Sequence, residues 1–217
     1  MKRGRKVINY VMCLVAALFL FGCAGVGGIK VNMKQDSYAP AFRAEDYGRF
    51  KGKTVLIYNF TNNAANTKSW GYYSADKKVY YEAPVHLESY LWYCFQKAFQ
   101  HAGMKVLDQS SYGGYYGQPY NPFWWGYGPP PPPPQGQQAL PKNTAELQLV
   151  LNSMTDQECK FQVLVSKSGE SKLQKDFTVT MPPTASEDKG ELEKGAYRLV
   201  EQMVITVFKD KDFQKAL

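Results

Sequence analysis

Three successive segments in the second half of the chain alternate between apolar and polar residues, and this pattern constrains the fold most. The segments lie at 146–151, 159–165 and 177–181. A two-residue period is typical of a β-strand with one buried face. The turn around Gly169 joins the last two segments, so the sequence predicts a three-stranded antiparallel meander. The predicted inward residues are Leu147, Leu149, Leu151, Cys159, Phe161, Val163, Val165, Phe177, Val179 and Met181.

Two further stretches repeat apolar residues every three or four positions, which predicts amphipathic helices at 84–101 and 187–209. Pro84 suits the first turn of the earlier helix, and Gly103 suits its C-terminal stop. The predicted inward residues are Leu87, Tyr90, Leu91, Cys94, Ala98 and Ala102 in the first helix, and Leu192, Ala196, Tyr197, Leu199, Val200, Met203 and Val207 in the second.

A run of β-branched and aromatic residues at 54–60 predicts a buried central strand, because both of its faces are apolar. We expect a loop at 61–74 and a short edge strand at 78–82. These elements together predict an α+β fold, a two-layer sandwich with two helices packed on one face of a mostly antiparallel sheet of four or five strands.

The first 22 residues have the organisation of a secretory signal. Lys2, Arg3, Arg5 and Lys6 precede an apolar run at 7–21. This run has about 15 residues, fewer than the roughly 20 that a membrane-spanning helix needs. A removed signal peptide is therefore favoured over a retained transmembrane helix.

Leu20 and Gly22, directly before Cys23, resemble the lipobox of bacterial lipoproteins. This resemblance implies that Cys23 becomes the acylated N-terminus; the alternative is an ordinary signal followed by an unmodified cysteine. Two or more acyl chains anchor a protein stably in a membrane. Ala24, rather than Asp, follows the cysteine, and by resemblance to enterobacterial sorting this implies an outer-membrane location facing the periplasm.

The expected organisation is a signal peptide at 1–22, an acylated Cys23 with a flexible tether at 23–50, and one α+β domain at 51–217. An insertion at about 110–141 interrupts the domain. Within it, six consecutive prolines at 129–134 require polyproline II and cannot donate backbone hydrogen bonds.

The insertion also concentrates aromatic residues at 112–127. Exposed aromatic side chains at such density are typical of an interface. A membrane headgroup layer, a glycan or a partner protein that grips the prolines would each suit them, and the alternative is a loop that folds back on its own domain. The candidate contact residues are Tyr115, Tyr116, Tyr120, Phe123, Trp124, Trp125 and Tyr127.

The sequence contains no recognisable catalytic, cofactor-binding or metal-binding motif. Its two histidines, His86 and His101, fall near opposite ends of one predicted helix and cannot share a metal. We therefore predict a protein that is not an enzyme, with no cofactor and no metal.

Cys94 and Cys159 are both predicted to face the core. In an oxidising periplasm they could form a disulfide closing a loop of about 65 residues, with a stabilisation of roughly 4 kcal/mol. The alternative is a pair of free thiols packed as small apolar groups.

The formal net charge of +7 is partly due to the signal, because its removal leaves about +3. The remaining charges are dispersed and of mixed sign, which argues against a nucleic-acid partner.

A lipobox followed by a strand, a helix, a three-strand meander and a C-terminal helix resembles a group of small envelope lipoproteins, including the YajG-like family and the LptE-like subunits of the lipopolysaccharide translocon. The resemblance covers residues 53–108 and 144–210 and is one of element order. It implies a two-layer α+β domain. The resulting hypothesis is an envelope lipoprotein that acts as a binding or assembly accessory, with an envelope protein or a glycan as partner. The alternative is a structural lipoprotein that contacts peptidoglycan or a surface complex through its aromatic loop.

Overall fold

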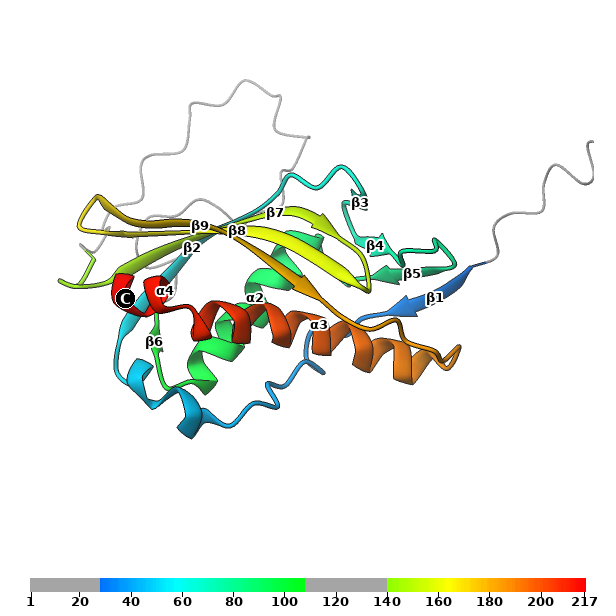
Figure 1. Ribbon diagram of the computed structural model, residues 1–217, viewed down its shortest axis with the longest axis horizontal. Coiled ribbons are helices and arrows are strands. Elements are labelled where there is room, and N and C mark those ends of the chain that lie inside the picture. The colour runs from blue at the N-terminus through cyan, green and yellow to red at the C-terminus, as the bar shows by residue number, and fades with distance from the viewer. Residues whose placement is uncertain (1–27, 108–139) are drawn as a thin grey trace, which may run out of the picture.

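The computed structural model describes residues 28–107 and 140–217, which form two β-sheets and a set of helices (Figure 1). In chain order the elements are β1 (Ile29–Asn32), the 3-10 helix η1 (Ala44–Phe50), β2 (Thr54–Asn62), β3 (Thr67–Lys68), β4 (Gly71–Tyr73), β5 (Val79–Glu82), α2 (Leu87–His101), β6 (Lys105–Val106), β7 (Ala145–Met154), β8 (Glu158–Lys167), β9 (Glu170–Thr180), α3 (Lys189–Lys209) and α4 (Lys211–Ala216).

The larger sheet has five strands in the order β6-β2-β7-β8-β9. β7, β8 and β9 form the predicted antiparallel meander. β2 is parallel to both of its neighbours. Parallel neighbours need a crossover, and α2 supplies it between β2 and β6. β2 is therefore a central strand, as its apolar sequence predicts.

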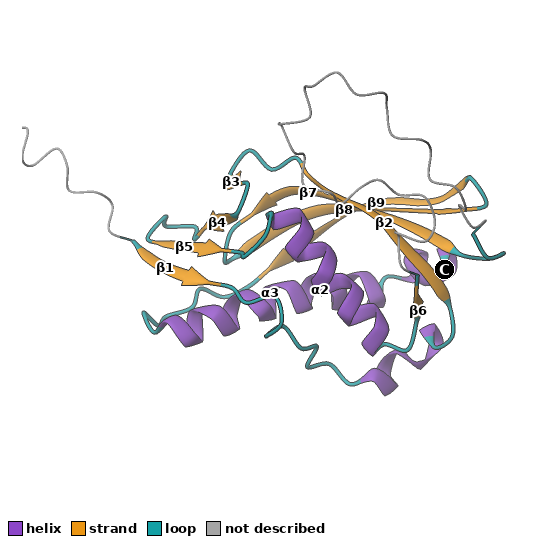
Figure 2. Ribbon diagram, turned by 180° about the vertical axis from the view of Figure 1, so that it is seen from behind, coloured by secondary structure: helices purple, strands orange, loops and turns teal. Residues whose placement is uncertain are grey.

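α2 and α3 cover one face of this sheet (Figure 2). All of the predicted inward residues of the two helices are buried except Tyr197, which is half-buried. The opposite face of the sheet carries exposed polar residues such as Gln148, Lys160 and Thr178. The α+β class and the placement of both helices on one face are confirmed.

Local interactions set the C-terminal end of α2 and the N-terminal start of α3. Gly103 adopts a φ of +83°, which glycine favours, and the amide of Met104 then donates to the carbonyl of Phe99 over 3.1 Å. At the start of α3, the Asp188 carboxylate accepts a 3.0 Å hydrogen bond from the amide of Glu191. α3 therefore begins two residues later than the periodicity indicates.

A second sheet of four strands, in the order β1-β5-β4-β3, is not predicted by the sequence pattern. The expected loop at 61–74 is wrong, since it contains the end of β2 and all of β3 and β4. The expected edge strand at 78–82 is also wrong in its position. β5 lies between β1 and β4 inside the small sheet. Short strands of two to four residues show too little alternation to be recognised.

The expected flexible tether at 23–50 is wrong for residues 29–50, which belong to the folded domain. β1 pairs in parallel with β5, and η1 buries Tyr47 and Phe50. Between them, Tyr38 is 1% exposed. The domain therefore begins at residue 29 or earlier rather than at residue 51, because isolated apolar residues in this segment find partners that are distant in the sequence.

Candidate functional site

The residues expected to carry lipid and to contact a partner lie outside the described part of the chain. They are Cys23, Tyr115, Tyr116, Tyr120, Phe123, Trp124, Trp125 and Tyr127. The described residues include those that directly follow the N-terminal segment and those on either side of the aromatic insertion.

The junction with the N-terminal segment is fixed at β1. The amide of Ile29 donates to the carbonyl of Lys78 over 2.9 Å. A Cβ added at Gly28 would lie 2.5 Å from that same carbonyl oxygen. The approach of the chain to β5 is therefore so close that position 28 must be a glycine. Only five residues separate Cys23, the residue expected to be acylated, from Ile29 at the start of β1.

Residues 33–50, which follow β1, are fastened to the helices by specific polar contacts. The amides of Ala41 and Phe42 both donate to the same carboxylate oxygen of Glu201 over 2.7 Å. The Tyr197 hydroxyl accepts from the amide of Lys34 over 3.0 Å. A carboxylate that receives two backbone hydrogen bonds binds strongly. This segment, which we call the N-terminal strap, is thus held across α3.

Both histidines have structural roles at opposite ends of α2. The ring of His86 stacks on Trp70 with 4.6 Å between ring centroids. The Nε2 atom of His101 lies 2.8 Å from the carbonyl oxygen of Phe42 in the N-terminal strap. No group of three or more His, Cys, Asp or Glu residues that could hold a metal occurs in the described ranges.

Cys94 and Cys159 are free thiols, both fully buried, so the structure has the second of the two arrangements that the sequence allows. Burial raises the pKa of each thiol to about 12. Both thiols are therefore protonated near neutral pH, and neither is a nucleophile. They act as small apolar groups of the core.

Three buried tyrosines form a polar feature that sequence reasoning missed. The hydroxyls of Tyr38 and Tyr72 have no hydrogen-bond partner among the described residues. The hydroxyl of Tyr90 lies beside the thiol of Cys94. Burial is the main cause that raises the pKa of all three phenols well above the ordinary value. They stay neutral at physiological pH, and aromatic content alone gives no signal for them.

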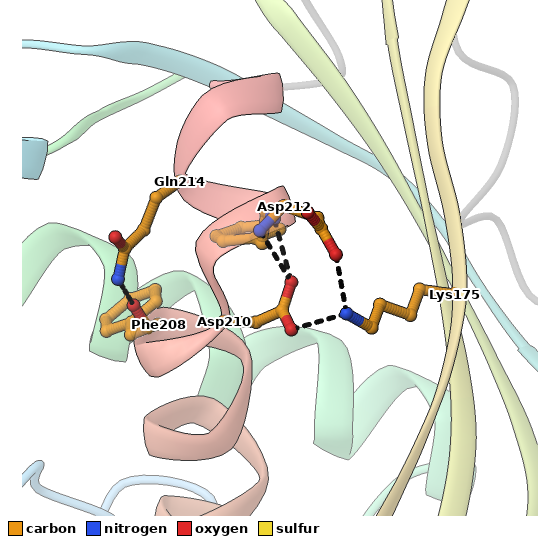
Figure 3. Close-up of polar contacts among 6 residues, drawn as sticks. Lys175, Phe208, Asp210, Asp212 and Gln214 are labelled. Atoms are coloured by element: carbon orange, nitrogen blue, oxygen red, sulfur yellow. Dashed lines mark hydrogen bonds and ion pairs between the residues drawn. The ribbon is translucent and has the colours of Figure 1, made fainter.

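A charged cluster joins the end of α3 to β9 (Figure 3). Lys175 donates to Asp210 over 2.7 Å and to Asp212 over 2.8 Å. These bonds raise the pKa of Lys175. Burial acts to raise the pKa of Asp210, but the bonds from Lys175 and from the amide of Phe213 outweigh it and lower that pKa. Because Asp210 also caps α4, this cluster is structural.

The exposed surface offers few large apolar groups. Trp70, 46% exposed, is the one large hydrophobic residue that is exposed within residues 28–107 and 140–217. No helix in these ranges is long and apolar enough to cross a membrane. The described surface therefore presents mainly polar and charged groups to a partner.

No family model matches the sequence, and no curated protein matches it. The crystal structure of protein XCC0632 from Xanthomonas campestris, described with the family model DUF330, is a similar solved structure. It aligns with 8% sequence identity and a TM-score of 0.48, over 87% of this chain and 94% of that one. This likeness is too distant to support an argument about function.

Proposed function

We propose that this chain is a non-enzymatic lipoprotein of the bacterial cell envelope. It is acylated at Cys23 and acts in the periplasm, on the outer membrane, as a binding or assembly accessory. The observation that carries the proposal is the sequence up to Cys23, which is a signal that ends in a lipobox-like motif. The first strand of the domain, β1, begins six residues after Cys23.

The short connection has a physical consequence for such a lipoprotein. An extended chain spans at most about 3.6 Å per residue, so Cys23 and Ile29 are at most about 22 Å apart. The acyl chains would therefore hold the β1 end of the domain close to the membrane surface. A partner embedded in that membrane would therefore meet the β1 end of the domain within about 22 Å of the lipid attachment, which suits an accessory protein.

The chemistry of the described residues supports a binding role over a catalytic one. The thiols of Cys94 and Cys159 are protonated and inaccessible. The ring of His86 stacks on Trp70, and the ring of His101 contacts the backbone carbonyl of Phe42. The cysteines and histidines of the described residues are thus engaged in the fold, which leaves none of these four side chains free to act as a nucleophile or general base.

The test is crosslinking and affinity purification from membranes, after mass spectrometry has established the state of Cys23. Three forms are compared: the intact protein, a variant lacking residues 112–138, and Cys23→Ser. We expect a specific envelope protein to be captured by the intact form and lost with Cys23→Ser. Capture of the same proteins by all three forms would contradict both the anchoring and the role of the aromatic segment.

The aromatic density of 112–127 also favours a second candidate, a structural lipoprotein that binds peptidoglycan or a surface complex. Sugar rings stack on exposed aromatic side chains, so replacing Trp124 and Trp125 by Ala should abolish co-sedimentation with purified peptidoglycan. If the intact protein does not sediment with peptidoglycan, the second candidate is excluded and the first is favoured.

A further inference from the structure

Lysines gather at one end of the five-stranded sheet, with one contributed by each strand or by the residues next to it. Adjacent strands lie about 4.8 Å apart, so five strands place these lysines along roughly 20 Å. We call this set the lysine row. In the order of the strands β6, β2, β7, β8 and β9 it consists of Lys105, Lys53, Lys142, Lys167 and Lys172.

Most of the charge of the lysine row is uncompensated. Lys53, Lys105 and Lys142 have no carboxylate partner within the described residues, whereas Lys172 pairs with Glu170. Lys167 donates to a backbone oxygen of Leu217 over 2.6 Å.

The electrostatics of Lys167 show that these ammonium groups are close enough to repel one another. Burial is the main cause that lowers its pKa, and the charges of Lys53 and Lys172 lower it further. This contrasts with Lys175 in β9, whose two aspartate partners raise its pKa. An anionic ligand at the lysine row would relieve the repulsion.

The lysine row lies at the end of the domain opposite to β1. Figures 1 and 2 both show β1 at one end of the molecule and the β8–β9 turn at the other. The strands between these ends, such as β7 with its 10 residues, are about 33 Å long. A domain anchored through the residues before β1 therefore carries the lysine row on its far end, away from the lipid attachment.

We propose that the lysine row is a docking surface for an acidic polypeptide segment, supplied by the partner of this lipoprotein. The inference rests on the proposed function and specifies the chemistry of the partner. Carboxylates three or four residues apart on a helix are about 5–6 Å apart, which matches the spacing of neighbouring strands. The distance from the lipid attachment favours a protein over lipid headgroups as the source of the negative charge.

The test uses the purified full-length protein in a nonionic detergent and labelled poly-L-glutamate as the probe, with binding followed by fluorescence anisotropy. The variant Lys53→Gln/Lys105→Gln/Lys142→Gln removes the three lysines of the row that have no carboxylate partner in residues 28–107 and 140–217. The control Lys68→Gln/Lys78→Gln/Lys189→Gln removes the same net charge from β3, from the residue before β5 and from the start of α3, toward the other end of the domain. Circular dichroism verifies that both variants are folded.

We expect the lysine-row variant to bind the probe at least about tenfold more weakly and the control variant less than about twofold more weakly, because charge complementarity acts locally. Equal losses in the two variants would overturn the proposal, since net charge alone would then explain binding. Absence of binding by the unmodified protein at low salt would overturn it as well.

Vesicles of phosphatidylglycerol test the other source of negative charge. Binding to vesicles that depends on the lysine row, without such dependence for poly-L-glutamate, would assign the row to a membrane surface and overturn the proposal. The membrane capture experiment separates this inference from the proposed function. A partner captured equally by the intact protein and by the lysine-row variant defeats the inference alone, while capture of no partner defeats the proposed function.

Discussion

The two sheets of this domain differ in how their strands are held. In the five-stranded sheet, long strands pair over many residues and bury a continuous apolar face under α2 and α3. In the four-stranded sheet, strands of two to four residues approach each other closely at Gly28 and Gly71, and their buried side chains pack into the core formed by the rest of the domain. The larger sheet is therefore specified locally, and the smaller sheet, with the N-terminal strap, is specified by tertiary structure.

The largest loss of stability should come from a change at Phe208, because this side chain packs against both α2, which covers the larger sheet, and the N-terminal strap. Its ring lies 4.9 Å from the ring of Phe99 in α2 and 4.9 Å from that of Phe50 in η1. We expect Phe208→Ala to lower the free energy of unfolding by about 4 kcal/mol, measured by urea denaturation. The control Trp70→Ala, at an exposed ring, should change it by less than about 1 kcal/mol. Equal effects of the two changes would contradict the assignment of Phe208 to the core.

A change at Gly71 should break the small sheet selectively. A Cβ at this position would lie 1.8 Å from the carbonyl oxygen of Tyr81. We expect Gly71→Ala to destabilise the small sheet by about 3 kcal/mol, with faster hydrogen exchange in β5 and unchanged exchange in β8. Gly48→Ala is the matched control, since nothing lies within 4 Å of its Cβ position. Unchanged exchange in β5 would show that the close approach is not required.

Removing the Glu201 carboxylate should release the N-terminal strap. Hydrogen bonds to a charged group contribute about 1.5–3 kcal/mol, so Glu201→Ala should cost about 2 kcal/mol in local stability. Hydrogen exchange of the Ala41 and Phe42 amides should accelerate, because both donate to this group. Gln202→Ala, at an exposed position of the same helix, should leave these amides protected. Protection that survives Glu201→Ala would mean that packing alone holds the strap.

The difference between the two sheets explains which parts of the fold the sequence pattern predicts. The alternation around Phe161 and the helical period around Leu91 are local signals, and both gave correct elements. The segment around Tyr38 has no period, and its burial depends on side chains more than 50 residues away, such as Tyr197. The lysine row could not be predicted either, because the sheet order brings its members together. The acylation of Cys23 stays a prediction.

Asp210, between α3 and α4, should make a smaller contribution to stability that depends on pH. The pKa of Asp210 is lower in the folded protein than its ordinary value of 3.8, so its stabilisation is complete above that value and is lost as the pH falls through the folded pKa. We expect Asp210→Ala to cost about 1 kcal/mol at pH 7 and less at pH 3. Thermal unfolding at the two pH values measures this difference, and Asp176→Asn serves as an exposed control. A cost that is independent of pH would contradict the role of the ionised carboxylate.

The smallest change in stability should come from removing the hydroxyl of Tyr72 in the small sheet. Tyr72 is fully buried, and its ring stacks on Tyr81 with 4.9 Å between centroids. Because its hydroxyl has no hydrogen-bond partner among the described residues, Tyr72→Phe should be neutral or stabilising by up to about 1 kcal/mol. Tyr197→Phe should instead destabilise, since that hydroxyl bonds to the backbone of Lys34. A thermal shift assay compares the two. A large loss of stability with Tyr72→Phe would reveal a partner for the hydroxyl.

The central claim is that the domain is held at a membrane through acyl chains on Cys23, a few residues before β1. The most direct test is metabolic labelling with palmitate, followed by membrane fractionation, of the unmodified protein and of Cys23→Ser. The account predicts a labelled protein in the membrane fraction, and for Cys23→Ser neither label nor cleavage after residue 22. A mature protein that begins elsewhere, or that stays unlabelled and soluble, would contradict the account.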